Sequence, residues 1–125
     1  MNTTIRVFSV DDHALFREGI AMMINCQPGM LMVAQASNGR EAIEAFREHQ
    51  PDVTLMDLRL PDMSGIDAMI AIRTEFPQAR IIILTTFESK TEVERALAKG
   101  ASAYVLKSAH PKDLAEAIRR VHGQQ

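Results

Sequence analysis

Five short apolar runs alternate along this chain with longer stretches whose apolar residues recur at helical spacing. This alternation predicts five strand-helix units, and parallel strands joined by helical crossovers form an open sheet with helices on both faces. The run Ile81-Ile82-Ile83-Leu84 is apolar at every position, as in a central strand that helices cover on both sides. We therefore expect an α/β fold, a doubly wound five-stranded parallel sheet in one domain over residues 1–125, with strands at residues 5–10, 30–36, 53–56, 80–84 and 103–106.

Residues that begin or end helices lie between these runs. Asn38 and Ser64 each carry a side-chain oxygen that can cap the following helix, and residues 89–92 (SKTE) match a capping box. Gly100 stands where a left-handed cap would end the fourth helix, and Pro111 suits the first turn of the last one. These signals place helices between the strands and after the last strand.

Composition excludes several classes of protein. The longest apolar runs are too short to span a bilayer, and no charged-then-apolar signal segment begins the chain, so we expect a soluble cytoplasmic protein without a membrane partner. The formal net charge of −2 lacks the basic excess of a domain that binds a nucleic-acid backbone by itself. The single cysteine, Cys26, excludes an internal disulfide, and we expect it to be a small buried hydrophobic residue.

Chemically active side chains follow four of the five expected strands. Asp11 and Asp12 follow the first strand, Asp57 the third, Thr85 the fourth and Lys107 the fifth. Ligands of open parallel sheets bind beyond the carboxyl ends of the strands, so we expect these side chains to meet at one rim. Converging carboxylates are unfavourable unless a cation or a bound substrate offsets their charge, so this rim is the expected functional site.

The residue types at the rim suit magnesium-dependent phosphoryl transfer. Carboxylate oxygens are hard ligands, and a site with few of them suits Mg²⁺, which also bridges to phosphate. Asp57 can then attack a phosphoryl group as a nucleophile and form an acyl phosphate, a reaction that needs positioning and charge neutralisation. Mg²⁺, the Lys107 ammonium and the Thr85 hydroxyl would supply that neutralisation.

The chain closely resembles the response-regulator receiver domains of two-component signalling, over essentially its whole length. The motifs that carry the resemblance are VDDH (residues 10–13), LMDLRLPDMSG (55–65), LTT (84–86) and GASAYVLK (100–107). One such motif alone is weak, whereas their order and spacing together are specific. The resemblance implies the (βα)5 flavodoxin-like receiver fold, with strand order 2-1-3-4-5.

The resemblance also implies a role for each acidic residue of the rim. Asp57 would be the phosphoacceptor, phosphorylated by a sensor histidine kinase. Asp12 and Asp57 would ligate Mg²⁺ directly, the Arg59 carbonyl would complete the protein ligands, and Asp11 would act largely through water.

The switch of the family would use Thr85 and Tyr104. Thr85 and Lys107 would hold phosphoryl oxygens, with Thr85 moving toward the phosphoryl group and Tyr104 rotating inward behind it. This movement would repack the face formed by the fourth helix, fifth strand and fifth helix. We therefore expect a signalling domain that catalyses only its own phosphorylation and dephosphorylation, rather than a metabolic enzyme.

Further details are most similar to the NarL/FixJ branch, in which a linker and a LuxR-type helix-turn-helix follow the receiver. These details are Phe8, residues 11–19 (DDHALFREG), residues 85–87 (TTF) and Lys107-Ser108. No such module follows Val121, so DNA would be bound, and transcription regulated, only through an output domain outside this chain. A stand-alone receiver that acts through protein contacts is the alternative, and homodimer formation on phosphorylation stays open.

Other functions and roles fit these residues less well. A phosphatase of the haloacid-dehalogenase type needs a second Asp two residues after its nucleophile, where this chain has Arg59. A flavodoxin-like nucleotide binder needs a phosphate loop after the first strand, where Asp11 and Asp12 would repel phosphate. These two aspartates could also simply cap the first helix. His13 is expected to be an exposed first-turn residue, because Mg²⁺ prefers oxygen ligands.

Several positions depart from the commonest pattern of the family. Ser108 replaces the proline that follows the lysine in many receivers, which leaves the geometry of the Lys107–Ser108 peptide open. Thr86 is larger than the alanine often found there, and Arg59 and Phe87 would flank the path of attacking water. We expect these side chains to affect the lifetime of the acyl phosphate.

Overall fold

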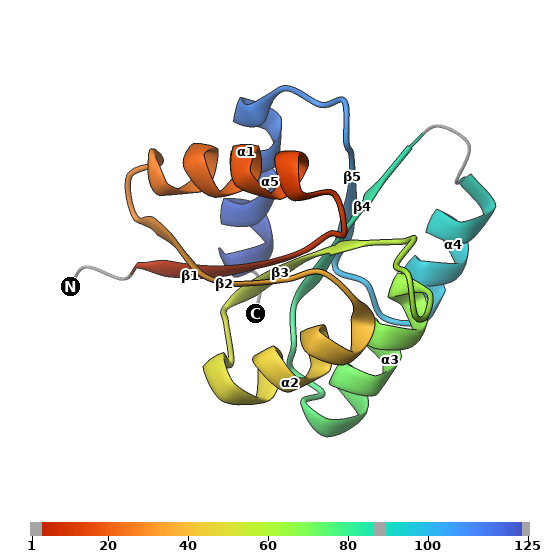
Figure 1. The fold of residues 1–125 in the computed structure, drawn as a ribbon. Coiled ribbons are helices and arrows are strands. Elements are labelled where there is room, and N and C mark those ends of the chain that lie inside the picture. Colours follow the sequence, from red (N-terminus) through yellow and green to blue (C-terminus); the bar gives the residue numbers. More distant parts are fainter. Residues whose placement is uncertain (1–3, 87–89, 124–125) are drawn as a thin grey trace.

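Five parallel strands form one sheet in the order β2-β1-β3-β4-β5, which confirms the expected fold class and strand order (Figure 1). The computed structural model describes residues 4–86 and 90–123. The elements are β1 (Ile5–Val10), α1 (Ala14–Asn25), β2 (Met30–Ala36), α2 (Gly39–His49), β3 (Val53–Asp57), α3 (Gly65–Glu75), β4 (Ile81–Thr85), α4 (Lys90–Ala98), β5 (Ala103–Leu106) and α5 (Pro111–Gly123).

Two strands extend one residue beyond their predicted carboxyl ends. Asp57 is the last residue of β3 and Thr85 the last of β4, because the sheet ladder continues to them. Asp57 pairs with Leu84, and Thr85 pairs with Leu106. Both functional candidates are thus fixed by the sheet itself rather than by a loop.

The described helix ends agree with the signals in the sequence. Asn38 accepts a hydrogen bond from the Glu41 amide at 2.9 Å, and Ser64 accepts one from the Asp67 amide at 3.1 Å. Gly100 has φ +115°, a conformation that L side chains rarely adopt. The capping box predicted at residues 89–92 begins outside the described residues.

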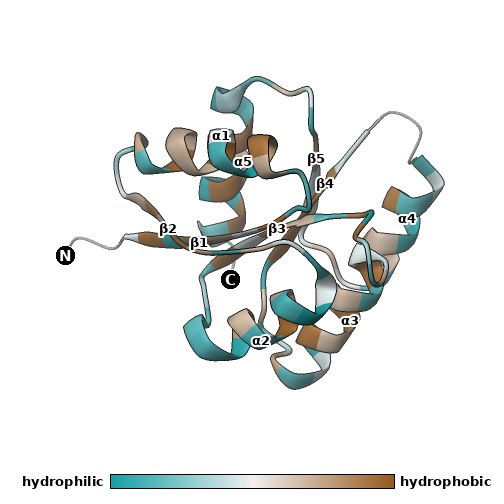
Figure 2. Cartoon of the chain, viewed as in Figure 1, coloured by the Kyte–Doolittle hydropathy of each residue, from teal (hydrophilic) through white to brown (hydrophobic). Residues whose placement is uncertain are grey.

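Side-chain alternation divides the apolar residues of the sheet between two cores. Because successive strand residues point to opposite faces, one core lies under α1 and α5 and the other under α2, α3 and α4 (Figure 1). Hydrophobic residues gather on the strands and on the inner sides of the helices, whereas outer helix faces are largely hydrophilic (Figure 2). The first core contains Val7, Leu55, Ile82 and Leu84, and the second contains Phe8, Val10, Met56, Ile81 and Ile83.

The expectation that Cys26 is buried is wrong. Cys26 is exposed because it follows the last residue of α1 as its C-cap, where the chain has left the apolar face of the helix. Within residues 4–86 and 90–123, no helix combines the length and apolar composition needed to cross a membrane.

Candidate functional site

Three of the expected charged residues lie on the α1/α5 side of the sheet. Asp57 continues the side-chain alternation of Val53 and Leu55, which belong to the core under α1 and α5. Asp11 and Lys107 directly follow β1 and β5 at the same edge of the sheet. Strand pairing and alternation together therefore bring two carboxylates and an ammonium to one point.

Lys107 lies between the two carboxylates. Its Nζ atom is 2.9 Å from Oδ2 of Asp57 and 2.9 Å from Oδ2 of Asp11. Asp11 is completely buried and Asp57 is 5% exposed, so both carboxylates are largely removed from water. The Asp11 Oδ2 atom forms an ion pair with Nζ but accepts no hydrogen bond of good geometry from the described residues. One ammonium thus serves two buried carboxylates, which leaves this part of the rim negative.

Burial and neighbouring charges have opposing effects on the pKa values of Asp57 and Lys107. Burial raises the pKa of Asp57, the Lys107 ammonium lowers it, and the nearby Asp11 charge raises it again, with a net rise. Burial would lower the pKa of Lys107, but its interactions with Asp11 and Asp57 outweigh burial and raise it. Lys107 therefore stays positively charged at neutral pH.

Asp12 and His13 complete an acidic cluster beside this ion pair. Ligand atoms of Asp11, Asp12, His13 and Asp57 all lie within 4.8 Å of one another. The Nδ1 atom of His13 is 2.8 Å from Asp11 Oδ1 and 3.2 Å from Asp12 Oδ1. Three carboxylates with one incompletely bonded buried oxygen form a hard, oxygen-rich donor set, so the residues present fit Mg²⁺.

The structure excludes helix capping as the explanation for the acidic pair. The N-cap of α1 is His13, which is exposed as expected, and this helix has no side-chain cap hydrogen bond. Asp11 Oδ1 instead accepts a hydrogen bond from the His13 amide at 2.8 Å, before the helix begins. The capping interpretation of Asp11 and Asp12 is therefore wrong.

Thr85 lies on the other face of the sheet from Asp57. It shares the alternation of Ile81 and Ile83, which face α2, α3 and α4, and its side chain is buried. Its hydroxyl donates to the Thr86 carbonyl at 3.2 Å. A cavity of about 110 Å³ nevertheless joins the two faces at the rim, and its lining is His13, Asp57, Leu58, Arg59, Thr85, Thr86 and Lys107.

The loop after β3 is held tightly against Asp57. The Gly65 amide donates to the Leu58 carbonyl at 2.7 Å, and a Cβ atom at Gly65 would overlap the Asp57 carbonyl oxygen. Arg59 lies in this loop, and its guanidinium pairs with Glu92 of α4 at 3.0 Å. Arg59 therefore connects the loop beside Asp57 to the first turn of α4.

Tyr104 stands beside a groove between α4 and β5. Tyr104 is 51% exposed, and the alternation of β5 points its side chain to the α4 side of the sheet, opposite to that of Lys107. The groove has a volume of about 430 Å³, and Thr85 lines it together with Tyr104. Thr85 therefore borders both the rim cavity and the groove.

Sequence reasoning did not find several contacts of the site. His13 was placed at the helix start but not against the carboxylates, and the Arg59–Glu92 pair joins residues far apart in sequence. The Phe16 ring, which the sequence placed within the motif at residues 11–19, lies 4.9 Å from Lys107 Nζ. Only the short separation between His13 and the acidic pair could have suggested that His13 contacts these carboxylates.

The Lys107–Ser108 peptide, whose geometry the sequence left open, is trans, since no cis peptide occurs in the described segments. Phe87, which was expected to flank the path of water, lies outside the described residues.

Fold and site together define an α/β domain whose carboxylates and lysine meet at the carboxyl edge of a parallel sheet. The response regulator receiver domain family matches residues 7–119, and the chain belongs to this family. It is therefore a signalling domain of a two-component system, and receiver domains of this kind are phosphorylated by sensor histidine kinases.

Relatives support this assignment along nearly the whole chain. The chain is 40% identical to the response regulator protein VraR of Staphylococcus aureus over 117 residues, which is 94% of this chain and 56% of VraR. It thus spans about half the length of the curated relatives it matches.

Solved structures agree. A two-component response regulator of the LuxR family from Aurantimonas sp. SI85-9A1 has TM-score 0.91 and 40% identity, covering 96% of this chain and 86% of that one. A DNA-binding response regulator of the LuxR family from Staphylococcus aureus has TM-score 0.89 and 27% identity, covering 95% and 99%. These relatives agree with the NarL/FixJ branch that the motifs indicated.

Proposed function

We propose that Asp57 is the phosphoacceptor of this receiver domain. The observation that carries the proposal is the buried Asp57 carboxylate with the Lys107 ammonium held 2.9 Å from its Oδ2 atom, beside an open cavity. A carboxylate oxygen of Asp57 attacks phosphorus of the donor phosphohistidine, the new O–P bond forms and the N–P bond breaks. The leaving imidazole takes a proton, and Asp57 becomes an acyl phosphate.

Asp11, Asp12 and Asp57 would hold Mg²⁺ in this reaction, with the Arg59 carbonyl as a further ligand. Their oxygen-rich cluster is the support for this assignment. When bound, Mg²⁺ supplies positive charge that offsets the carboxylates and the phosphoryl oxygens.

Lys107 neutralises the transferred group. A phosphoryl group carries up to about two negative charges, so it is a stronger partner for the ammonium than a single carboxylate. Lys107 therefore exchanges part of its contact with Asp11 and Asp57 for a phosphoryl oxygen. Its raised pKa keeps the proton on Nζ during this exchange.

Thr85 and Tyr104 would convert phosphorylation into a change of shape. The Thr85 hydroxyl would give up its bond to the Thr86 carbonyl and donate to a phosphoryl oxygen across the rim cavity. Because Thr85 also lines the groove at Tyr104, this movement would free space for the tyrosine ring. The α4-β5-α5 face would then repack, which changes the surface offered to partners.

The domain would also end its own signal by hydrolysis. Water attacks phosphorus, the O–P bond to Asp57 breaks, and inorganic phosphate leaves. Arg59 lines the cavity that this water must enter, so its side chain would affect the lifetime of the acyl phosphate.

For the whole protein we propose transcription regulation through a DNA-binding output domain outside this chain. The support is that similar chains are LuxR-family response regulators, one of them described as DNA-binding. In this role the protein would act in the cytoplasm, and its active state would be a homodimer that forms on phosphorylation.

Intact mass after incubation with acetyl phosphate and Mg²⁺ tests the phosphoacceptor. We expect the wild type and the exposed control Asp113→Asn to gain one phosphoryl group, and Asp57→Asn to gain none. EDTA should suppress the gain. If the wild type stays unmodified, or Asp57→Asn is modified at the wild-type rate, the proposal is wrong.

A further inference from the structure

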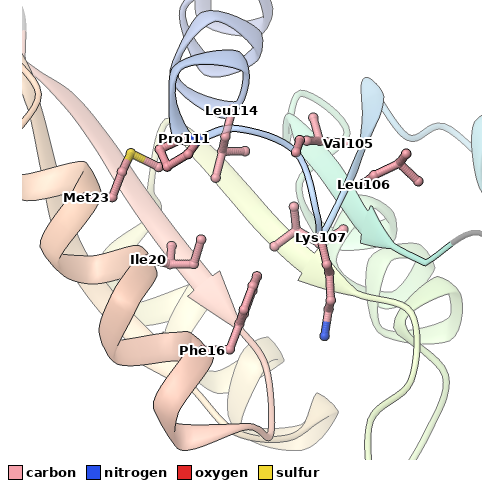
Figure 3. A pocket seen from close by; sticks show the side chains of 10 residues that line it. Phe16, Ile20, Met23, Val105, Leu106, Lys107, Pro111 and Leu114 are labelled. Atoms are coloured by element: carbon pink, nitrogen blue, oxygen red, sulfur yellow. The ribbon is translucent and has the colours of Figure 1, made fainter.

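The Lys107 ammonium has a third neighbour besides its two carboxylates. The centroid of the Phe16 ring lies 4.9 Å from Nζ, within the range of a cation–π contact. Figure 3 shows Phe16 on α1 facing the Lys107 side chain across the mouth of a small pocket. Helix α1 thus contributes an uncharged partner to a site otherwise built from strand ends.

The surroundings of Lys107 separate its stem from its charge. The stem borders an apolar pocket of about 140 Å³, lined by residues of α1, β4, β5 and α5, including Ile20, Val105 and Leu114 (Figure 3). Only the ammonium reaches the rim, where the carboxylates and the aromatic ring lie. A long lysine chain is flexible, so partners at its tip are needed to fix its position.

We propose that Phe16 is a positioning residue for Lys107, whose ring holds the ammonium at the rim before and during phosphoryl transfer. This proposal rests on the proposed role of Asp57. The carboxylates must share their charge with Mg²⁺ and with the incoming phosphoryl group, so their hold on Lys107 weakens during the reaction. The ring is not a ligand for Mg²⁺ and does not repel phosphate, so its contact persists while the ammonium changes anionic partners.

A purely apolar role for Phe16 makes a different prediction. Phe16 is half-buried and packs at the edge of the core under α1 and α5. A leucine would satisfy that packing, whereas only an aromatic ring can attract the ammonium through its face. The substitutions Phe16→Leu and Phe16→Tyr therefore separate the two roles.

The test compares phosphorylation rates with acetyl phosphate and Mg²⁺, measured by intact mass. We expect Phe16→Leu to slow phosphorylation about three- to tenfold, and Phe16→Tyr to stay within about twofold of the wild type. Met23→Leu, which changes the same pocket away from the ammonium, is the matched control and should also stay within about twofold. If Phe16→Leu keeps the wild-type rate, or Phe16→Tyr is as slow as Phe16→Leu, the ring has no positioning role.

A second measurement does not depend on phosphorylation. In NMR spectra, the Lys107 Cε protons should show an upfield ring-current shift in the wild type and in Phe16→Tyr, and this shift should disappear in Phe16→Leu. Unchanged Lys107 shifts in Phe16→Leu would overturn the proposal even if the wild type accepts phosphate. Conversely, a wild type that shows the ring-current shift but gains no phosphoryl mass would contradict the role of Asp57 and leave the Phe16 contact established.

Discussion

Helices α4 and α5 cover opposite faces of the same strands, β4 and β5, but they are packed very differently. Helix α5 buries five residues against the sheet: Leu114, Ala115, Ala117, Ile118 and Val121. Helix α4 buries only Val93 and Ala96, and it borders a groove of about 430 Å³. The pocket on the α5 side is about a third of that volume, at about 140 Å³.

Because of this difference in packing, the two faces of the sheet are suited to different steps of the proposed function. The closely packed side holds Asp11, Asp57 and Lys107 in fixed geometry, as the proposed phosphoryl transfer to Asp57 would require. The loosely packed side carries Thr85 and Tyr104, next to empty volume into which side chains can move. A segment with few buried contacts needs little free energy to move, so the α4 side is suited to the proposed change of shape.

Truncating a matched valine in each helix gives the largest expected effect. Val121 of α5 is 1% exposed and Val93 of α4 is 7% exposed. We expect Val121→Ala to lower the free energy of unfolding by about 2 kcal/mol and Val93→Ala by about 1 kcal/mol. The cost is smaller for Val93 because its side chain lies on the loosely packed side. Urea unfolding measures both values, and an equal or larger cost for Val93→Ala would break the comparison.

Magnesium should stabilise the packed side of the rim. At ten times its Kd, Mg²⁺ binding raises the free energy of unfolding by about 1.4 kcal/mol. Amide hydrogen exchange should slow more in β1 and β3, whose ends carry the acidic cluster, than in α4. Asp12→Asn should weaken the stabilisation, and chelation should remove it. Protection that is greatest in α4 would place the ion-dependent region on the wrong face.

The charged rim should reduce stability at neutral pH. A raised pKa of Asp57 means that its contribution to stability is fully present below the ordinary carboxyl pKa and is lost as pH rises through the higher folded value. We therefore expect Asp57→Asn to raise the melting temperature at pH 7 by roughly 2–4 °C, since the Lys107 ammonium offsets much of the cost of burying the Asp57 charge. This advantage should shrink on acidification through the carboxyl range. Thermal scans from pH 3 to 8 check it, and an advantage that grows toward low pH would contradict the assignment.

The smallest effect concerns the ion pair that joins the two regions. Arg59 and Glu92 are partly exposed, so Glu92→Gln should change the free energy of unfolding by at most about 0.5 kcal/mol. Hydrogen exchange in the first turn of α4 should nevertheless become faster, because this pair joins that turn to the loop after β3. Glu75→Gln, which breaks the exposed Arg47–Glu75 pair between α2 and α3, is the control and should leave α4 unchanged. Equal exchange in both variants would show that Arg59 does not restrain α4.

Much of this molecule could be read from its sequence because the signals are local. Apolar alternation predicted the strands, and side chains such as Asn38 and Ser64 predicted helix starts that the hydrogen bonds confirm. The residues after the strands predicted a shared rim, which holds for Asp11, Asp57 and Lys107. The roles of these residues in phosphoryl transfer stay predictions that the experiments above address.

Other features depend on distances between elements, which local patterns do not contain. The exposure of Cys26 depends on where α1 leaves the sheet, and the Arg59–Glu92 pair depends on where α4 lies against the loop after β3. The contact of Phe16 with Lys107 likewise depends on how closely α1 approaches the end of β5.

The sequence by itself determined the strand-helix alternation, the sheet and the meeting of acidic residues with a lysine, because periodicity and strand ends follow from backbone geometry. Only the tertiary structure decided that Lys107 bridges Asp11 and Asp57 on the closely packed face of the sheet, while Thr85 lies on the loosely packed face. Helix packing sets these separations to within a few ångströms, and ion pairing and cation–π attraction depend on such distances.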